Sequence, residues 1–475
     1  MIEKWYRSKA GDLQLVYDRM PPFVRSGLTS VRGWALARNR YAPENLRLLD
    51  ELVSRERATP DQIERQQVES LQRALDTARQ HCPFYRDYPA LQVASTADWA
   101  RLPVLSRTDV RENAAALTNQ SIPERERIAV ATTGTTGSSL KVYYTTAIMR
   151  KNWAFRMQQF LWAGVQPKTP RLTAFGNRVV PPNRKTPPYW VHNAAEHQIF
   201  LSIFHLSPQA APDYLSFLRQ HTGWVLEGFP STLTILADFI LSSGEPVPMR
   251  AIFTDGEPVP ASLREKLEMA FAAQLFNTYG NTELCGLIQQ CRHGGMHLST
   301  EYAFLEILDE DNRPVRPGET GYLVWTGFLN DATPLLRYRI GDRGSWDTAQ
   351  PCPCGRSTPL VDPGMTRESD VLYAADGRVF SPRSVNQVLK GTTAFRFCQF
   401  LQQEPGQVLV RAVGEGEQAR NELSKVRNEI ARLLGDGSTV ATELADVPIM
   451  KAGGKTPLII QSTNSVFRRL PEVVA

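Results

Sequence analysis

The chain reads Ala131-Thr132-Thr133-Gly134-Thr135-Thr136-Gly137-Ser138-Ser139-Leu140-Lys141 between two short apolar runs, 128–130 and 142–144. Six hydroxyl side chains, two glycines and one lysine fall inside this stretch. The pattern predicts a strand, a loop and a second strand. Glycines let a loop turn its backbone N–H groups toward one point, and such loops bind anions. A polyphosphate is the ligand that the added hydroxyls and the lysine favour.

Two other interpretations fit this loop less well than phosphate binding. Glycine and threonine are also common in polar hairpin turns, but a plain turn does not need six hydroxyl groups. A Walker loop does not fit, because Ser139 stands five residues after Gly134, where the second glycine belongs, and no Gly-Lys-Ser/Thr follows. We therefore expect a phosphate-binding loop of another class.

Length and composition predict a globular protein with two or three domains. The chain has 475 residues, of which 42% are apolar and 22% charged. Its net charge of +5 is spread out rather than gathered in basic blocks, so no nucleic-acid partner is expected. No apolar run is long enough for a transmembrane segment, residues 1–7 lack the core of a signal peptide, and six cysteines are too few for a disulfide framework. These features predict a cytoplasmic protein.

Apolar spacing predicts an α/β fold. Residues 61–81 show helical periodicity, and Ser106 is a predicted helix N-cap. Between 164 and 256 strands and helices alternate, which favours a parallel sheet with helices on its faces. Ligands of such sheets lie at the carboxyl ends of the strands. The segments 254–257 and 278–283 each follow a short apolar strand and are therefore expected at that edge.

The pattern of apolar and turn-forming residues changes after about residue 300. Short apolar runs alternate with turns, which predicts hairpins in a small β subdomain over about 300–364. The last hundred residues have the pattern of a separate α+β unit, with strands at 395–401 and 407–412 and a helix at 418–434.

Five segments follow one another in an order that carries a family resemblance. They are the loop at 132–141, Gly256-Glu257, Tyr279-Gly280-Asn281-Thr282-Glu283, the stretch 337–342 and Gly453-Gly454-Lys455. Together they resemble the adenylate-forming superfamily of acyl-CoA synthetases, peptide-synthetase adenylation domains and luciferases. The resemblance covers most of residues 65–460.

Four further segments are similar to the phenylacetate–CoA ligase branch, and within it to the capsular-polysaccharide-associated adenylate-forming proteins. They are Cys82-Pro83-Phe84-Tyr85-Arg86, Leu102-Pro103-Val104-Leu105, Phe204-His205-Leu206-Ser207 and Gly228-Phe229-Pro230-Ser231. The resemblance implies an ATP-dependent ligase. A carboxylic acid would attack the α-phosphorus of ATP to give an acyl-adenylate and pyrophosphate, and the acyl group would pass to coenzyme A or to an amine acceptor.

The resemblance also implies a set of residues that bind ATP. The expected contacts to the β- and γ-phosphates are Thr132, Thr133, Gly134, Thr135, Thr136, Gly137, Ser138 and Lys141. The expected contacts to the rest of the nucleotide are Gly256, Glu257, Tyr279, Gly280, Arg339 and Asp342. Of these, Tyr279 would stack on adenine, and Asp342 would accept hydrogen bonds from both ribose hydroxyls, as a carboxylate can.

Three residues are expected to act on the reacting phosphate. Two anions must meet in this reaction, so catalysis needs fixed positive charge and hydrogen-bond donors around them. Thr282 would contact the α-phosphate, Glu283 would bind Mg²⁺ through oxygen, and Lys455 would neutralise the α-phosphate and the attacking carboxylate. Lys141 would add charge at the loop.

Taken one by one, these residues have structural explanations too. Tyr279 and Gly280 could be a strand end and a turn, Arg337 and Asp342 a surface ion pair, and Lys455 a solvated lysine. Lys451 competes with Lys455, but only Lys455 follows the glycine pair. The shared order of the segments favours the functional interpretation.

The resemblance implies a large N-terminal domain, 1–364, with mixed or parallel sheets flanked by helices and the small β subdomain. A hinge at 365–370 would join it to a small, mobile α+β C-terminal lid domain, 371–475. The family's hinge usually reads Gly-Arg-x-Asp-Asp, whereas Met365 follows Gly364 here and the register differs. Asp370 is the best hinge candidate.

Cysteine and histidine residues predict a structural zinc site. Cys352-Pro353-Cys354-Gly355 is a tight knuckle that points two sulfurs one way, and Cys291 precedes two histidines closely. Three thiolates and one nitrogen form a closed zinc set. The predicted ligands are Cys291, His297, Cys352 and Cys354, with His293 or Cys285 as substitutes. Inert buried cysteines are the alternative.

The identity of the acid is open, because core packing explains the candidate pocket residues equally well. Phe204, His205, Trp224 and Phe229 are predicted to line a pocket that suits an aromatic or apolar acid. Another class of function is a non-catalytic descendant that binds nucleotide or acyl-adenylate in a biosynthetic assembly, such as one for polysaccharide. Glu283, Asp342 and Lys455 argue against it, because a binding protein has no use for a first-step lysine.

Overall fold

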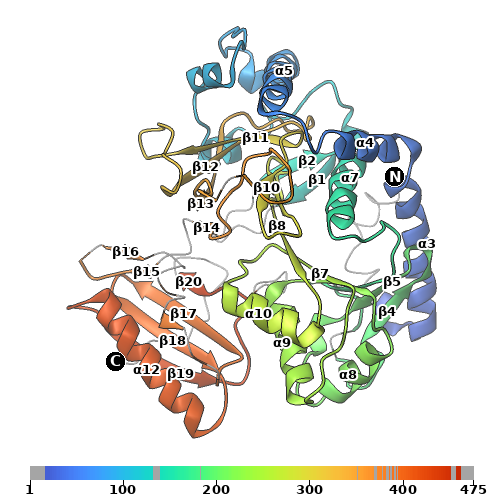
Figure 1. Ribbon diagram of the computed structural model, residues 1–475, viewed down its shortest axis with the longest axis vertical. Helices are drawn as coiled ribbons and strands as arrows, with labels where there is room; N and C mark the ends of the chain where they lie inside the picture. The colour runs from blue at the N-terminus through green and yellow to red at the C-terminus, as the bar shows by residue number, and fades with distance from the viewer. Residues whose placement is uncertain are drawn as a thin grey trace. The chain divides into compact units, whose positions relative to one another are not determined.

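The computed structural model describes most of the chain, as two compact units (Figure 1). The described residues are 16–131, 140–181, 183–349, 351–367, 372–376, 378–380, 385, 388–389, 392, 394–450 and 456–461. The first unit contains the described residues up to Ile340 together with Gly344–Pro363. The second contains Gly341–Arg343 and the described residues from Gly364 onward.

An antiparallel pair of strands flanks the predicted phosphate loop. β1 (Ile128–Ala131) pairs with β2 (Lys141–Tyr144), and Ala131 lies opposite Lys141. The predicted order of strand, loop and strand is confirmed for its two strands. The loop between them lies outside the described residues.

An eight-stranded sheet forms the centre of the first unit, in the order β10-β9-β8-β7-β6-β3-β5-β4. Its strands are β3 (Arg171–Ala174), β4 (Trp190–Asn193), β5 (Gln198–Leu201), β6 (Val225–Gly228), β7 (Ala251–Asp255), β8 (Leu275–Gly280), β9 (Leu287–Gln290) and β10 (Met296–Leu298). The neighbours β5, β3, β6, β7 and β8 run parallel, as the alternating sequence predicted. β4, β9 and β10 are antiparallel to their neighbours, so the sheet is mixed.

Helices before and between the parallel strands contribute to the core of this unit. They are α7 (Thr146–Trp162), α8 (Ala211–Arg219), α9 (Pro230–Ser242) and α10 (Ala261–Phe271). Leu233, Leu236 and Ile240 of α9 are fully buried in the cluster that also holds Leu226 and Ile252 of the sheet. Strands covered on both faces need nearly continuous apolar residues. The apolar runs in the sequence therefore indicate where these strands lie.

The helices α3 (Pro22–Arg40), α4 (Pro43–Ser54) and α5 (Pro60–His81) lie early in the described part of the chain, before the sheet. α5 matches the predicted helix and begins with a capping box, in which Thr59 and Gln62 each bond the other's backbone N–H. The short η1 (Pro83–Tyr85) and η2 (Thr96–Arg101) follow. No helix in the described part of the chain has both the length and the apolar character to cross a bilayer.

The β subdomain is built from β11 (Ala303–Leu308), β12 (Gly321–Gly327) and β13 (Tyr338–Gly344). Leu105 extends it, because its N–H donates to Arg337 O and its C=O accepts from Arg339 N, both at 2.8 Å. This places α6 (Arg107–Glu112) next to the sheet, and Ser106 caps α6 as predicted. The remaining short helices are η3 (Glu124–Glu126), η4 (Ala194–Glu196) and η5 (Ile203–His205).

The second unit has an α+β arrangement of the predicted type. Its sheet has the order β19-β18-β17-β20, and the two smaller ladders join β14 to residues 342 and 343 of β13 and β15 to β16. The elements are β14 (Thr366–Arg367), β15 (Leu372–Tyr373), β16 (Val379–Phe380), β17 (Phe397–Glu404), β18 (Gln407–Val413), α12 (Gly416–Leu434), β19 (Thr439–Ala445) and β20 (Ile459–Gln461). α12 buries Leu423, Val426 and Ile430 in the core of this unit. The proposed domain and hinge boundaries stay predictions.

Candidate active site and metal centre

Four parallel strands end at the same edge of the large sheet. β3, β6, β7 and β8 are in-register neighbours. The residues at or just beyond their carboxyl ends are Phe175, Phe229, Gly256 and Tyr279. The structure therefore brings together the two segments, 254–257 and 278–283, that the sequence placed at a ligand-binding edge.

The turn after β7 is fixed by the start of α9. Gly256 has φ +76°, a left-handed conformation that side chains disfavour. The carboxylate of Glu257 accepts hydrogen bonds from the backbone N–H of Ser231, at 2.8 Å, and from its hydroxyl, at 2.9 Å. Ser231 lies in the first turn of α9, where a negative charge is favourable. Glu257 thus holds this turn, whatever it adds to nucleotide binding.

The segment after β8 combines a stacked aromatic ring with solvent-exposed backbone. The ring of Tyr279 stacks on Trp325, with centroids 5.9 Å apart and planes 18° apart. Gly280 and Thr282 are exposed, and a Cβ at Gly280 would meet only Leu287, at 3.8 Å. This segment can accept a flat ligand without displacing other backbone.

Glu283 is the buried carboxylate of this edge, with 3% of its surface exposed. The Tyr338 hydroxyl donates to it at 3.2 Å, and Arg107 Nη1 lies 3.9 Å away. Asn330 donates to its backbone carbonyl at 3.2 Å. Burial, together with the carboxylate of Glu283, raises the pKa of Tyr338 well above its usual value, so this hydroxyl stays protonated and donating. Sequence analysis missed Tyr338 and Arg107 because both are distant from Glu283 along the chain.

Other predicted ATP contacts lie on β2 and β13. Lys141 is exposed, with its Nζ 5.1 Å from the centre of the Tyr143 ring. The Arg339 guanidinium lies over the Tyr322 ring at 3.1 Å. In the second unit, Asp342 is buried and lies opposite Arg367 in the β13–β14 ladder.

Arg337 has a structural environment of its own. It is buried and binds Glu306 through two contacts of 2.9 Å, and it also donates to the carbonyls of Ala100 and Leu102. The alternative of a surface ion pair between Arg337 and Asp342 is therefore wrong. Arg337 attaches residues 100–102 to the β subdomain.

The predicted pocket residues divide between two edges of the sheet. Phe204 is 40% exposed, and His205 follows β5 at the carboxyl edge. Both His205 nitrogens are engaged, Nδ1 with the Ser202 hydroxyl at 2.7 Å and Nε2 with the Pro181 carbonyl at 3.1 Å. Trp224 immediately precedes β6 and so lies at the opposite, amino edge, which corrects its assignment to this pocket.

Phe229 has a partner at the carboxyl edge that sequence analysis did not name. Its ring packs edge-on against Phe175, with centroids 5.0 Å apart. The other predicted site residues lie outside the described part of the chain: Thr132, Thr133, Gly134, Thr135, Thr136, Gly137, Ser138, Asp370 and Lys455.

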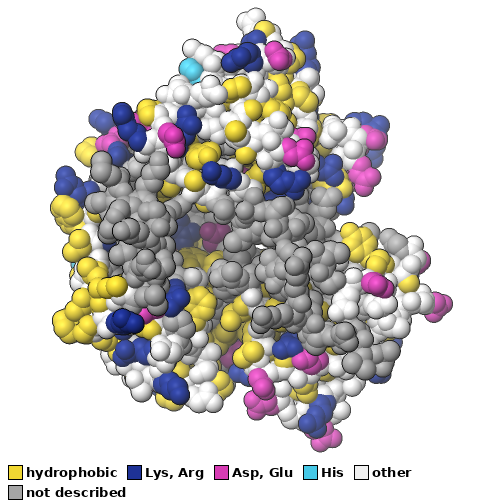
Figure 2. Space-filling model, turned by 180° about the vertical axis from the view of Figure 1, so that it is seen from behind, with side chains coloured by type: hydrophobic (Ala, Val, Ile, Leu, Met, Phe, Trp, Pro, Cys, Tyr) yellow, Lys and Arg dark blue, Asp and Glu magenta, His cyan; other side chains and the backbone are white. Residues whose placement is uncertain are grey.

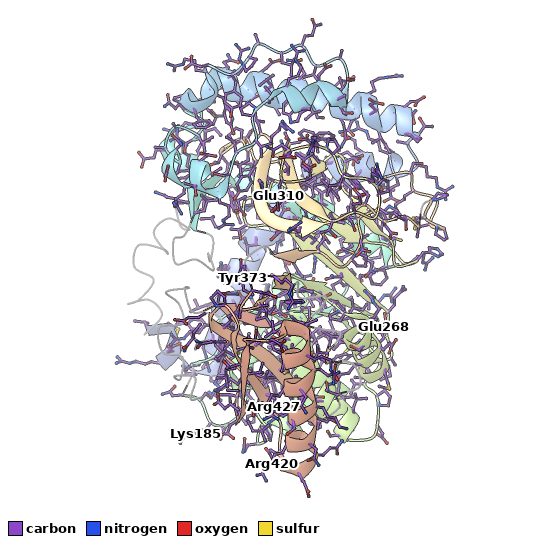
Figure 3. The ribbon with its side chains drawn as sticks, turned by 90° about the vertical axis from the view of Figure 1, so that its left-hand side faces the viewer. Lys185, Glu268, Glu310, Tyr373, Arg420 and Arg427 are labelled. Atoms are coloured by element: carbon purple, nitrogen blue, oxygen red, sulfur yellow. The ribbon has the colours of Figure 1, made fainter. Side chains whose placement is uncertain are left out.

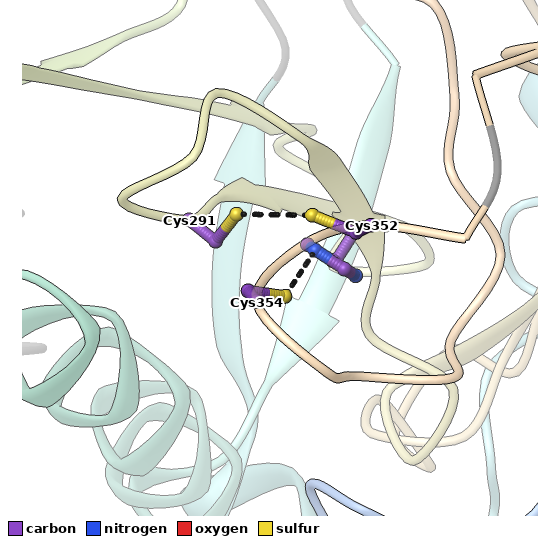
Figure 4. A group of neighbouring side chains, drawn as sticks. Cys291, Cys352 and Cys354 are labelled. Atoms are coloured by element: carbon purple, nitrogen blue, oxygen red, sulfur yellow. Dashed lines mark hydrogen bonds between the residues drawn. The ribbon is translucent and has the colours of Figure 1, made fainter.

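A separate cluster gathers the four predicted zinc ligands. The ligand atoms of Cys291, His297, Cys352 and Cys354 all lie within 4.8 Å of one another. Figure 4 shows the two pairs, Cys291 Sγ to Cys352 Sγ at 3.6 Å and Cys354 Sγ to His297 Nε2 at 3.2 Å. The sulfur separation is too long for a disulfide. Cys291 follows β9, His297 lies on β10 and the Cys-Pro-Cys turn faces them.

The donor set fits a tetrahedral zinc ion. Zn–S bonds of about 2.3 Å at the tetrahedral angle would hold two sulfurs about 3.8 Å apart, close to the 3.6 Å between Cys291 Sγ and Cys352 Sγ. His297 Nδ1 is 2.9 Å from the Thr358 hydroxyl, which orients the ring so that Nε2 faces the sulfurs. Burial, with Arg356 nearby, lowers the pKa of His297 to about 4, so its imidazole is neutral as a ligand must be.

The suggested substitutes do not belong to this cluster. His293 is exposed, and the Cys285 thiol lies 3.4 Å from Asn281 Oδ1 instead. A Cβ at Gly295 would lie 2.9 Å from the Cys352 sulfur, so the hairpin approaches the knuckle more closely than any side chain at 295 allows.

A buried charge network was also missed by sequence analysis. Arg171 and Glu227 are 1% and 4% exposed, and Glu227 accepts from Arg156 at 3.1 Å. Arg171 also binds Glu196, which in turn accepts from Arg40 of α3 at 2.6 Å. The network joins α3 and α7 to the sheet.

The chain is similar to known ligases in sequence and in fold, although no family model matches it. It is 23% identical to protein CapK of Staphylococcus aureus over 470 residues, which cover 95% of this chain and 99% of that protein. It is 25% identical to a phenylacetate-coenzyme A ligase of Thermus thermophilus over 338 residues, 68% of this chain and 74% of the relative.

A solved structure has the same fold. It is 2-hydroxyisobutyryl-CoA ligase in the postadenylation state, in complex with R3-HIB-AMP. The TM-score is 0.69 at 19% identity, and the match covers 87% of this chain and 92% of that one. The predicted α/β class, with mixed sheets flanked by helices, is confirmed.

Proposed function

We propose that the chain is a member of the adenylate-forming superfamily, in its phenylacetate–CoA ligase-like branch, and that it uses ATP to activate a carboxylic acid as an acyl-adenylate and then transfers the acyl group to coenzyme A. The observation that carries this proposal is the carboxyl edge of β3, β6, β7 and β8. There the glycine turn at Gly256 and the segment Tyr279–Glu283 lie side by side.

The nucleotide would lie along this edge. In the proposal, adenine stacks on the ring of Tyr279, which Trp325 supports from within the β subdomain. Gly256 and Gly280 let backbone approach the base, and Asp342 accepts from the ribose hydroxyls. The loop from Thr132 to Ser138, with Lys141, would bind the outer phosphates.

Glu283 would hold Mg²⁺, the hard cation that neutralises the phosphates during attack. Support comes from its surroundings, since Tyr338 donates to one carboxylate oxygen and Arg107 is near. These contacts orient the carboxylate. Thr282, exposed beside it, would contact the α-phosphate, and Lys455 would neutralise the attacking acid.

The acid would be apolar or aromatic. Phe175 and Phe229 form a ring pair at the carboxyl edge, and the exposed face of Phe204 follows the neighbouring β5. His205 would contribute the face of its ring, because both of its nitrogens already have hydrogen-bond partners. Trp224 is not part of this proposal.

The metal cluster would have a structural role. Cys291, His297, Cys352 and Cys354 supply four ligands and leave no position for a substrate. Zinc bound there would join the β9–β10 hairpin to the 352–355 turn and would take no part in acyl transfer.

The test is acid-dependent release of pyrophosphate from ATP, with hydroxylamine trapping the adenylate, run with and without coenzyme A. A panel of aromatic and aliphatic acids is screened with the wild-type chain. Glu283→Gln should lower the rate at least about a hundredfold, the cost of removing a charged group from a transition state. Glu310→Gln is the matched control, because Glu310 is an exposed carboxylate on the β11–β12 turn (Figure 3).

Each outcome separates the proposal from its competitors. Thioester formed only with coenzyme A supports the proposed acceptor, whereas hydroxamate without thioester would direct the search to amine acceptors. Release of ADP would identify a phosphotransferase. Tight ATP binding with no pyrophosphate from any acid would identify a non-catalytic binding protein.

A further inference from the structure

Helix α3 turns its polar side inward. Ser26 and Ser30 accept hydrogen bonds from the backbone N–H groups of His192 and Ala194, at 3.3 and 3.0 Å. A Cβ at Gly33 would lie 1.9 Å from Asn193 Oδ1, so the helix approaches β4 closely at that point. β4 is the edge strand of the large sheet, and α3 satisfies backbone groups that such an edge exposes.

The outer side of the same helix is apolar. Phe23, Leu28, Val31 and Trp34 are 76%, 47%, 68% and 56% exposed. Phe23, Val31 and Trp34 lie on one stripe of the helix, at positions i, i+8 and i+11, and the exposed Gly27 occupies position i+4 of the same stripe. Figure 2 shows yellow side chains gathered over α3 at the left edge of the view. Single exposed apolar residues are ordinary, but a row of them on one helix marks a contact surface.

The charged residues of α3 itself are all arginines. α3 contains no aspartate or glutamate, and Arg32 and Arg38 lie on its exposed side. Arg38 lies over the Trp34 ring at 4.9 Å. Asp18, four residues before the start of α3, is paired with Arg178. A partner of this face must offer apolar volume and negative charge.

We propose that the outer face of α3 binds the surface of an anionic lipid membrane. Aromatic and aliphatic side chains of such a helix enter the headgroup region, and the arginines contact lipid phosphates. The arginine stems also add apolar surface while their charged ends stay in water. The helix lies on the bilayer and does not cross it, consistent with its mixed composition.

A second copy of the chain fits this face less well. A twofold contact would place the same patch on both sides, so arginines of one copy would face the stripe of the other with no carboxylate from α3 to pair with. An acidic protein surface would satisfy the charge but needs a shaped apolar groove as well. Lipid supplies both properties without a matching shape.

The experiment measures sedimentation of the full chain with vesicles of phosphatidylcholine alone and of phosphatidylcholine containing phosphatidylglycerol. We expect binding to the anionic vesicles only, weakening as salt is raised. Phe23→Ser with Trp34→Ser should weaken it at least about tenfold, since two aromatic side chains no longer enter the lipid. Met269→Ser, on α10, is the matched control, because Met269 is 58% exposed and should leave binding unchanged.

A second pair of variants tests the charge. Arg32→Glu with Arg38→Glu should abolish binding to anionic vesicles. Arg420→Glu with Arg427→Glu makes the same change of charge on α12, where both side chains are exposed (Figure 3), and should retain binding. Thermal unfolding shows whether each variant is folded, and pyrophosphate release without vesicles should be unaffected by the α3 variants.

Three results would overturn the proposal. The first is no sedimentation with either vesicle. The second is binding that the α12 variants lose as strongly as the α3 variants. The third is a dimer, detected by light scattering, that Trp34→Ser dissociates, because a second copy would then occupy the face.

Discussion

The Tyr338 hydroxyl donates a hydrogen bond of 3.2 Å to the buried carboxylate of Glu283. The two residues come from different sheets, β13 and the turn after β8. The bond makes the β subdomain part of the proposed magnesium site, because it orients the carboxylate that would bind the ion.

Tyr338→Phe should therefore weaken magnesium binding. Loss of a hydrogen bond to a charged group costs about 1.5–3 kcal/mol, so we expect the half-saturating Mg²⁺ concentration to rise roughly tenfold. Titration of Mg²⁺ in the pyrophosphate assay measures it. Tyr302→Phe is the control, since Tyr302 is also buried but donates to Asn152, at 2.9 Å. If both variants raise the half-saturating Mg²⁺ concentration equally, the hydrogen bond from Tyr338 has no specific role in magnesium binding.

Loss of a sulfur ligand should release the metal. The wild-type chain is expected to hold about one zinc ion, by metal analysis of the purified protein. Cys352→Ser should remove most of it and lower the free energy of unfolding by roughly 3 kcal/mol or more, because metal binding is coupled to folding. Cys398→Ser changes a partly buried thiol outside the cluster and should keep the zinc. A zinc-free wild-type protein would contradict the assignment.

The buried network predicts a pH-dependent stability. Burial alone would raise the pKa of Glu227, but Arg156 and Arg171, with the hydrogen bonds from Arg156 and Thr173, outweigh it and lower that pKa. The carboxylate therefore stabilises the fold above its unfolded-state pKa of about 4.3, and this contribution is lost as the pH falls through the lower folded-state pKa.

Glu227→Gln should cost roughly 3 kcal/mol at pH 7, because it leaves Arg171 buried with one charge partner fewer. The difference in the free energy of unfolding between this variant and the wild type should become smaller below about pH 4. Urea unfolding at both pH values measures it. Glu429→Gln, at an exposed pair with Arg432, should change stability by less than about 0.5 kcal/mol. A cost that is independent of pH would show that packing, not charge, stabilises this site.

Lys455→Ala should slow adenylate formation by several orders of magnitude while ATP binding is nearly unchanged, since the proposed contact forms in the transition state. Single-turnover pyrophosphate release and ATP titration separate the two effects. Lys451→Ala is the neighbouring control. If Lys451→Ala has the larger effect, the lysine assignment moves to that residue.

Helix periodicity, helix caps and apolar runs in the sequence correctly predicted helices and strands that are determined by neighbouring residues. The periodicity of 61–81 and the cap at Ser106 correspond to α5 and α6, and the apolar runs correspond to the parallel strands. The four metal-site residues were found because the knuckle fixes two of them locally and a hairpin supplies the others.

Long-range packing explains what the sequence did not predict. The contacts of Tyr338 and Arg107 with Glu283 join separate elements, so no spacing reports them. Trp224 immediately precedes β6 and Phe229 immediately follows it. The two residues are close in sequence but lie at opposite edges of the sheet, because the strand runs from one edge to the other. The sequence of residues 22–40 shows which side of the helix is apolar. Only the hydrogen bonds from the backbone of His192 and Ala194 to Ser26 and Ser30 show that this side faces outward.

The close approach of Gly295 to the Cys352 sulfur links two positions in evolution. A methyl group at 295 would sit 2.9 Å from that sulfur, so a homologue with alanine there could not keep the same ligand geometry. Glycine at 295 and the four ligands should consequently be inherited or lost together. An alignment in which alanine at this position accompanies an intact Cys-Pro-Cys turn would show that the turn has another purpose.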